Sequence, residues 1–204
     1  MHRRWVSGLG NGLTFSISWV FSPYVLNISP LSLLISLAII RVLKSFVSVD
    51  IKVKWPNDLL FNDKKFAGVL IESWRDQTGD IVAIIGIGIN FKLSNEIKLN
   101  IDNEVTDLFD MTGQFMDRNL ILSALLNELI VILMDFEKFG FEPYKNEWIE
   151  HHAFHKKLVI LLMPDSTKIL GTVTGINDDG SVCLQTSAGI RSFVAGEISM
   201  RQFL

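Results

Sequence analysis

The chain has 204 residues and a formal net charge of −3, and apolar residues make up 49% of it. This length suits one ordinary domain and a small second one, and the apolar share allows a sizeable buried core. The slightly acidic balance argues against a general nucleic-acid binder, which normally carries a basic surface. The single cysteine, Cys183, excludes an intrachain disulfide and fits a reducing, cytoplasmic compartment.

No targeting or membrane segment is expected. The first five residues, MHRRW, are not followed by the apolar core of a signal peptide. The most apolar window, residues 28–43, is interrupted by serines, a proline and an arginine. It lacks the roughly 18 uninterrupted apolar residues of a spanning helix. We therefore expect a cytoplasmic protein with no membrane partner.

A strand and a helix come first. Residues 13–20 alternate apolar and small polar side chains, which is the period of a half-buried strand. Ser29 and Pro30 favour a helix start, with Ser29 as the N-cap. Residues 31–46 then predict a mostly buried helix.

Lysines and apolar side chains alternate through residues 51–56, so the lysines share one face of a short strand. The Pro56-Asn57-Asp58 sequence predicts a turn. Residues 59–61 and 66–71 predict the two strands of a hairpin with a short polar loop.

Lys65 stands near the start of the returning strand. Strict alternation gives it the face of Ala67 and Val69, so we expect it to point inward, toward a cleft or a core. An inward ammonium group needs an anionic partner. The alternative is a solvated, lysine-rich strand edge, since lysines discourage edge-to-edge pairing.

A nearly continuous apolar run over residues 81–90 predicts a central strand covered on both faces. Gly86 and Gly88 share one face of this strand, where a ligand could approach the backbone closely. The pattern is no dinucleotide fingerprint, because a third glycine and an immediate helix are missing. The alternative is that the glycines relieve packing against the buried helix.

Residues 91–112 are polar and read as loop, and Asp117 then caps the longest helix, residues 120–139, which Gly140 ends. Residues 144–152 predict a shorter helix. His151 and His155 have a spacing that can hold a metal. Without a third ligand, surface histidines are the favoured interpretation.

From residue 156 the pattern changes to five short strands separated by turn sequences. A meander of this size closes best as a small SH3-like barrel docked on the main domain. A free-standing binding module is the alternative for this segment. We therefore expect two domains, residues 1–155 and 156–204.

Four motifs in order resemble the core signature of biotin protein ligases. They are KWPNDL at 54–59, KKFAGVLIE at 64–72, GIGIN at 86–90 and GEISMR at 196–201. The resemblance covers essentially the whole chain. It implies an α+β fold, with a mixed β-sheet packed with helices in a class II synthetase-like catalytic domain, followed by a C-terminal SH3-like β-barrel.

The resemblance also implies an activity. Biotin protein ligases use ATP to attach biotin, through biotinyl-AMP, to a lysine of the biotin carboxyl carrier protein of acetyl-CoA carboxylase. ATP and biotin are then substrates and Mg²⁺ is required. A lipoate ligase-like enzyme, or a non-catalytic fragment that binds the carrier protein, is the alternative. The KWPND and GEIS motifs favour biotin over lipoate.

Roles for individual residues follow from the same resemblance. Lys65 is expected to hold the biotin carboxylate and to stabilise charge during catalysis. Glu197 and Arg201 are expected to join the two domains. Arg118 could instead belong to an ordinary first helical turn. The remaining biotin contacts are expected at Gly68, Gly86 and Gly88, the nucleotide contacts at Arg3, Trp5, Lys54, Asn57, Asp58, Asn90 and Arg118, and a weak Mg²⁺ contact at Asp58.

The start of the chain departs from the family pattern. Only Arg3, Arg4 and Trp5 match the end of the family's Gly-Arg-Gly-Arg segment. We therefore expect an N-terminally truncated member without a DNA-binding domain, which binds no nucleic acid and ligates biotin poorly. A homodimer is possible.

Overall fold

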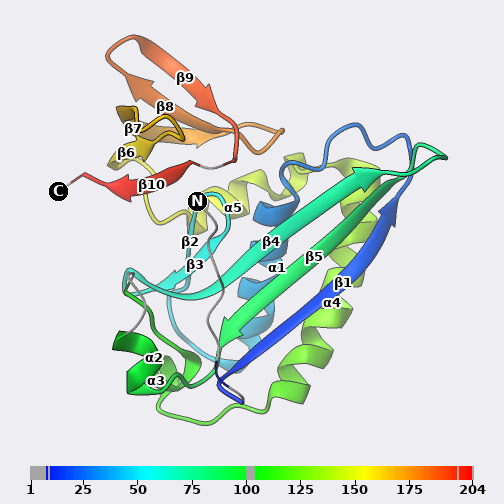
Figure 1. Ribbon diagram of the computed structural model, residues 1–204, viewed down its shortest axis with the longest axis vertical. Helices are drawn as coiled ribbons and strands as arrows, with labels where there is room; N and C mark the ends of the chain where they lie inside the picture. Colours follow the sequence, from blue (N-terminus) through cyan, green and yellow to red (C-terminus); the bar gives the residue numbers. More distant parts are fainter. Residues whose placement is uncertain (1–7, 9, 100–103, 197, 204) are drawn as a thin grey trace.

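The computed structural model describes residues 8, 10–99, 104–196 and 198–203, so Arg3, Trp5 and Glu197 lie outside the described residues. The described chain forms two β-sheets with helices (Figure 1). Helices pack on the first and larger sheet, and the second, smaller sheet is formed by the C-terminal strands. The α+β class expected from the sequence is confirmed.

The first sheet has the strand order β1-β5-β4-β3-β2. Every strand pair in it is antiparallel, where a mixed sheet was expected. Short turns join β2 through β5 in sequence, and such turns can link only antiparallel neighbours. The strands are β1 (Gly12–Phe21), β2 (Lys52–Lys54), β3 (Asp58–Phe61), β4 (Lys64–Arg75) and β5 (Ile81–Asn90).

Two long helices cover one face of this sheet, as Figure 1 shows for α1 (Leu31–Phe46) and α4 (Arg118–Phe139). Almost all of α1 is buried, as predicted. Its N-cap is Pro30 and no side chain caps it, so the predicted role of Ser29 is wrong. The stretch expected as loop contains two short helices, α2 (Asn95–Leu99) and α3 (Leu108–Thr112).

The ends of α4 are as predicted. The Asp117 side chain accepts the backbone N–H of Asn119 at 2.7 Å, and Gly140 ends the helix with a φ of 68°. Among the described helices, α4 is the one long and apolar enough to cross a bilayer. The expectation of no membrane segment rested on the window at 28–43 and missed this helix. The inner face of α4 packs on α1 and β1.

The second sheet has the strand order β10-β6-β7-β8-β9, and all its pairs are antiparallel. The five predicted strands are confirmed, as an SH3-like sheet rather than a closed barrel. Closure would require β9 and β10 to pair, and in the described part of the chain they remain at opposite edges. The strands are β6 (Leu158–Leu162), β7 (Lys168–Ile176), β8 (Val182–Thr186), β9 (Gly189–Phe193) and β10 (Ser199–Gln202).

The histidines lie where the first sheet meets the second. A 3₁₀ turn, η1 (Glu142–Tyr144), leads into α5 (Lys145–His151), which contacts β2 and β7. His151 and its neighbour His152 are buried and His155 is half-buried, so the expected surface position is wrong. His151 Nδ1 lies 3.2 Å from the Ile51 carbonyl oxygen, and its Nε2 lies 3.0 Å from Lys44 Nζ. The lysine can only donate, so the imidazole is neutral with its proton on Nδ1.

Candidate active site

The turn between β3 and β4 places Lys64 and Lys65 at the start of β4. Asn62 and Asp63 form it with φ values of 48° and 63°. Two successive positive φ values define a type I′ turn, which matches the twist of a hairpin. Asn and Asp tolerate this conformation better than other residues with side chains. The predicted hairpin and its polar loop are therefore confirmed.

A register shift turns Lys65 to the open face of the sheet. Leu59 pairs with Ala67, but Leu60 pairs with Lys65, which leaves Phe66 as the extra residue of a β-bulge. Phe66 and Ala67 are both fully buried on the helix side. The predicted inward orientation of Lys65, beside Ala67 and Val69, is therefore wrong, because strict alternation fails at the bulge.

The backbone of Lys65 is fixed by a segment far away in sequence. Its N–H donates to the Glu104 carbonyl oxygen at 3.0 Å, and its own carbonyl oxygen accepts the Thr106 N–H at 2.9 Å. Val105 forms a single parallel bridge to Lys65. The segment of residues 104–106 lies beside the start of β4. There it extends the sheet past the point where β5 ends, at Asn90.

Asn90 anchors this segment. Its side-chain Nδ2 donates to the Thr106 carbonyl oxygen at 3.1 Å, and both residues are buried. The predicted nucleotide residue thus also holds the strand that fixes Lys65. Nothing in the local sequence around residue 106 indicated this link.

A row of paired residues crosses the open face. Gly68 pairs with Gly88, and these two glycines lie between Thr14 on one side and Asp58 on the other. Residues that pair directly in a sheet project from the same face. The two glycines therefore leave a strip without side chains next to the Asp58 carboxylate. Gly68 is half-buried and Gly88 is buried, and neither has a Cβ atom that would hold a ligand away from the backbone.

Gly86 lies two residues before Gly88 on β5, on the same face, between Ser16 and Leu70. A Cβ atom built there would lie 3.5 Å from the Leu70 carbonyl oxygen, which is an ordinary contact. Its neighbours Ile85 and Ile87 fill the helix side. The glycines therefore face away from the buried helix, and the interpretation that they relieve packing against it is wrong.

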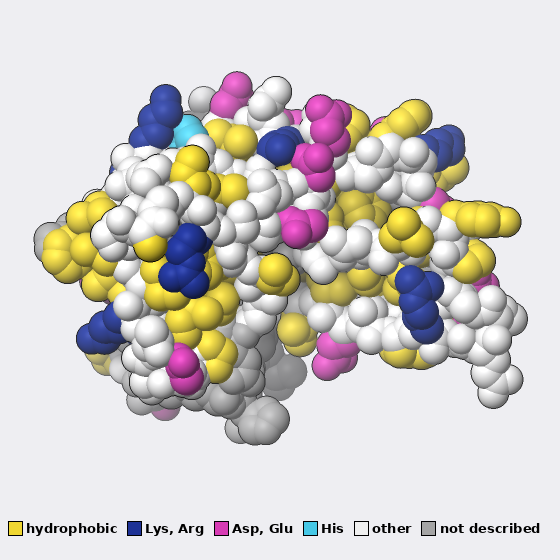
Figure 2. Space-filling view, turned by 90° about the horizontal axis from the view of Figure 1, so that it is seen from above, with side chains coloured by type: hydrophobic (Ala, Val, Ile, Leu, Met, Phe, Trp, Pro, Cys, Tyr) yellow, Lys and Arg dark blue, Asp and Glu magenta, His cyan; other side chains and the backbone are white. Residues whose placement is uncertain are grey.

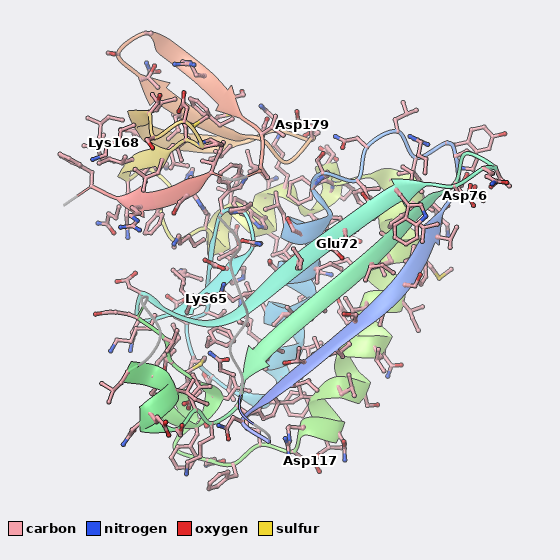
Figure 3. The ribbon with its side chains drawn as sticks, viewed as in Figure 1. Lys65, Glu72, Asp76, Asp117, Lys168 and Asp179 are labelled. Carbon is pink, nitrogen blue, oxygen red and sulfur yellow. The ribbon has the colours of Figure 1, made fainter. Side chains whose placement is uncertain are left out.

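Two lysines converge on one carboxylate beside this strip. Lys65 Nζ forms an ion pair with Asp58, and Lys54 Nζ lies 3.9 Å from the other oxygen of the same carboxylate. The side chains of Asp58, Lys54 and Lys65 are 15%, 26% and 31% exposed. Figure 3 shows Lys65 near the start of β4, well separated from Glu72 further along the same strand.

Asp58 does not fit a protein-held magnesium ion. A cation bound to its carboxylate would meet two ammonium groups. In addition, no group of three or more histidine, cysteine or acidic residues that could hold a metal occurs in the described ranges. Magnesium in this site would therefore have to arrive with a ligand that carries its own oxygen atoms.

Two other predicted site residues, Asn57 and Arg118, form hydrogen bonds to backbone carbonyl groups. Asn57 Nδ2 donates to the Val69 carbonyl oxygen at 2.8 Å, which holds the β2–β3 turn against β4. Arg118 Nη1 donates to the Gly10 carbonyl oxygen at 3.0 Å, just before β1. The structure thus brings Lys54, Asn57, Asp58, Lys65, Gly68 and Gly88 together and places Arg118 at the start of β1.

Two family models match the chain. The model described as "Biotin/lipoate A/B protein ligase family" matches residues 2–90, and "Biotin protein ligase C terminal domain" matches residues 157–201. The chain belongs to the biotin protein ligase family. The first model covers strands β1 to β5, and the second model covers almost all of the second sheet, β6 to β10. The family assignment therefore applies to both sheets.

Similar proteins agree with this assignment. The chain is 33% identical to "Bifunctional ligase/repressor BirA" of Escherichia coli over 98% of its own length and 61% of that protein. It therefore spans less than two thirds of this relative. It is 27% identical to "Biotin--[acetyl-CoA-carboxylase] ligase" of Paracoccus denitrificans, covering 96% of this chain and 82% of that protein.

A solved structure shows the same fold. The biotin protein ligase of Aquifex aeolicus in complex with biotin and ATP matches with a TM-score of 0.81 and 29% identity. The match covers 98% of this chain and 82% of that one. The fold of this chain is therefore similar to that of the Aquifex aeolicus protein over almost its whole length.

Proposed function

We propose that this protein is a biotin ligase that uses ATP to attach biotin to a lysine of the biotin carboxyl carrier protein of acetyl-CoA carboxylase. The observation that carries the proposal is the convergence of Lys65 and Lys54 beside the strip formed by Gly68 and Gly88. The names of the relatives from Paracoccus and Aquifex support the substrates.

The first step activates biotin. An oxygen of its carboxylate attacks the α-phosphorus of ATP, the bond from that phosphorus to the bridging oxygen breaks, and pyrophosphate leaves. The products are biotinyl-AMP and pyrophosphate. The step brings a carboxylate against a triphosphate, so charge neutralisation is its main requirement.

The two lysines provide this neutralisation. Lys65 holds the carboxylate of biotin and then the oxygens between the acyl carbon and the phosphorus. Lys54, directly across β2 and β3 from Asp58, faces the phosphates. Because both side chains are largely shielded from water, their charges act more strongly than they would in bulk solvent. Magnesium enters as part of the Mg·ATP substrate.

The second step transfers biotin. The neutral ε-amine of the acceptor lysine attacks the acyl carbon, the bond from that carbon to the phosphate oxygen breaks, and AMP leaves. The nitrogen loses a proton and an amide remains. We place the protein in the cytoplasm with its carrier, whose acceptor lysine would enter on the face of the sheet that Gly68 and Gly88 share.

Detection of the adenylate by mass spectrometry tests the proposal. The purified chain is incubated with Mg·ATP and either biotin or lipoate, with inorganic pyrophosphatase present, and the acyl-AMP is measured. We expect biotinyl-AMP and little lipoyl-AMP. Formation of lipoyl-AMP alone would indicate a lipoate ligase. Binding of the carrier without either adenylate would indicate a non-catalytic carrier-binding protein.

A further inference from the structure

The protein itself places an anion beside Lys65. Its ammonium group pairs with Asp58, whose second oxygen faces Lys54. A substrate carboxylate that binds Lys65 therefore meets a site where a carboxylate already lies.

We propose that Asp58 is an internal counter-anion that the biotin carboxylate displaces from Lys65, an inference that rests on the proposed function. Asp58 is thus a positioning residue. It holds the two lysines in place, and it competes with the substrate for one of them.

The fold allows this exchange. Asp58 pairs with Lys54 across β2 and β3 and with Gly68 across β3 and β4, so both of its strand neighbours fix its position. Lys65 lies on the other side of the bulge from Gly68, and its side chain extends to Asp58. The backbone of Lys65 is fixed by hydrogen bonds to Glu104 and Thr106. When Lys65 turns to a substrate, Asp58 still faces Lys54, and its charge remains paired.

The exchange predicts opposite effects on binding and on rate. Neutralising Asp58 removes the competitor, so biotin binds Lys65 more tightly. The same change leaves two neighbouring ammonium groups without the carboxylate that positions them, so the chemical step becomes slower. A residue with only a structural role would weaken both properties when changed, and a metal ligand would alter the magnesium requirement.

Asp58→Asn tests the proposal, because asparagine keeps the shape and removes the charge. Asp63→Asn is the matched control, since Asp63 lies in the exposed turn before β4 and its loss changes the net charge equally. Biotin binding is measured by calorimetry without nucleotide or magnesium. The rate of biotinyl-AMP formation is measured in a single turnover with saturating biotin and Mg·ATP.

We expect the Kd for biotin to fall about three- to tenfold in Asp58→Asn and to change less than about twofold in Asp63→Asn. The single-turnover rate of Asp58→Asn should fall about tenfold or more. Asp58→Ser, also neutral, gives the same test if the asparagine variant does not fold. Lys54→Met should raise the Kd, because Asp58 then pairs with Lys65 alone.

The outcomes separate the two proposals. If the unchanged chain binds no biotin, the proposed function is wrong. If the unchanged chain binds biotin but Asp58→Asn binds it equally or more weakly, only the counter-anion role is wrong. A rate of Asp58→Asn that equals the unchanged rate would contradict the positioning role.

Discussion

Trp55 donates its indole N–H to the main-chain carbonyl oxygen of Gly180, 3.0 Å away, and so joins the two sheets. Both residues are buried. Trp55 belongs to the turn that continues into Asp58, and Gly180 belongs to the turn between β7 and β8. The turn between β7 and β8 therefore contacts the turn that leads into Asp58.

Gly180→Ala should loosen this contact. Gly180 has a φ of 79°, and a Cβ atom there would lie 2.9 Å from Pro30 Cα. Both the backbone conformation and the contact disfavour a side chain. We expect a loss of about 1–3 kcal/mol in the free energy of unfolding, measured with urea. Gly175→Ala on β7 is the control, because a Cβ atom at Gly175 would meet nothing within 4 Å; equal losses in the two variants would contradict the account.

Asp107→Ala should disturb the segment that fixes Lys65. The buried Asp107 carboxylate accepts the N–H of Asp110 at 2.8 Å and of Leu93 at 2.9 Å, and it pairs with Lys98. Its loss leaves buried donors without acceptors, which costs about 2–4 kcal/mol. Hydrogen exchange at the amides of residues 65 and 106 should accelerate.

Asp110→Ala is the control for Asp107→Ala. The Asp110 side chain also pairs with Lys98, but it is 46% exposed. A partly solvated ion pair of this kind contributes about 0–1 kcal/mol. If both variants lose equal stability, or if exchange at residue 65 is unchanged in Asp107→Ala, the segment does not hold Lys65 as described.

His152 should make the fold sensitive to acid. Burial lowers the pKa of His152 from 6.5 to about 3. Below pH 6.5 the unfolded chain gains a proton that the folded chain does not, so stability falls as the pH falls from 6.5 toward 3. From His152 alone we expect a loss of about 2 kcal/mol between pH 7.5 and pH 5, measured as urea unfolding at each pH. Burial also lowers the pKa values of His151 and His155, so these residues add to the total loss.

His152→Gln isolates this contribution, because glutamine does not titrate. The variant should lose less stability between pH 7.5 and pH 5 than the unchanged chain, whatever its stability at pH 7.5. The carboxyl groups whose pKa values are lowered, such as Asp179, act at lower pH and do not interfere. An unchanged pH dependence in His152→Gln would contradict the burial of a neutral imidazole.

The sequence predicted the regular elements well because their signals are local. The alternation over residues 13–20, the cap at Asp117 and the stop at Gly140 each depend on neighbouring residues. The turn at Asn62 and Asp63 likewise follows from what these two residue types tolerate. The family resemblance then placed both sheets in one fold.

The details of the site depend on contacts that are distant in sequence. The bulge at Phe66 places Lys65 on the opposite face of the sheet from the one that strict alternation predicts. No residue type in this part of the sequence indicates a bulge. The hydrogen bonds from residues 104–106 to Lys65 cross about forty positions of the chain. The buried position of His152 depends on how α5 contacts β2 and β7, which the pattern of three histidines cannot reveal.

The distribution of surface charge does not indicate a binding partner. On the face seen in Figure 2, lysine, arginine and carboxylate side chains are scattered rather than gathered in one basic patch. The absence of nucleic-acid binding, the possible homodimer and the expected weakness of ligation stay predictions.

The measurement that tests the central claim most directly is the intact mass of a biotin carboxyl carrier domain after incubation with the chain, biotin and Mg·ATP. The unchanged chain and Lys64→Ala should each add one biotinyl group to the carrier, because Lys64 is exposed and its side chain leaves the strand on the face opposite to Lys65. Lys65→Ala should add none within the same time. Equal biotinylation by Lys65→Ala, or none by a folded, unchanged chain, would contradict the account.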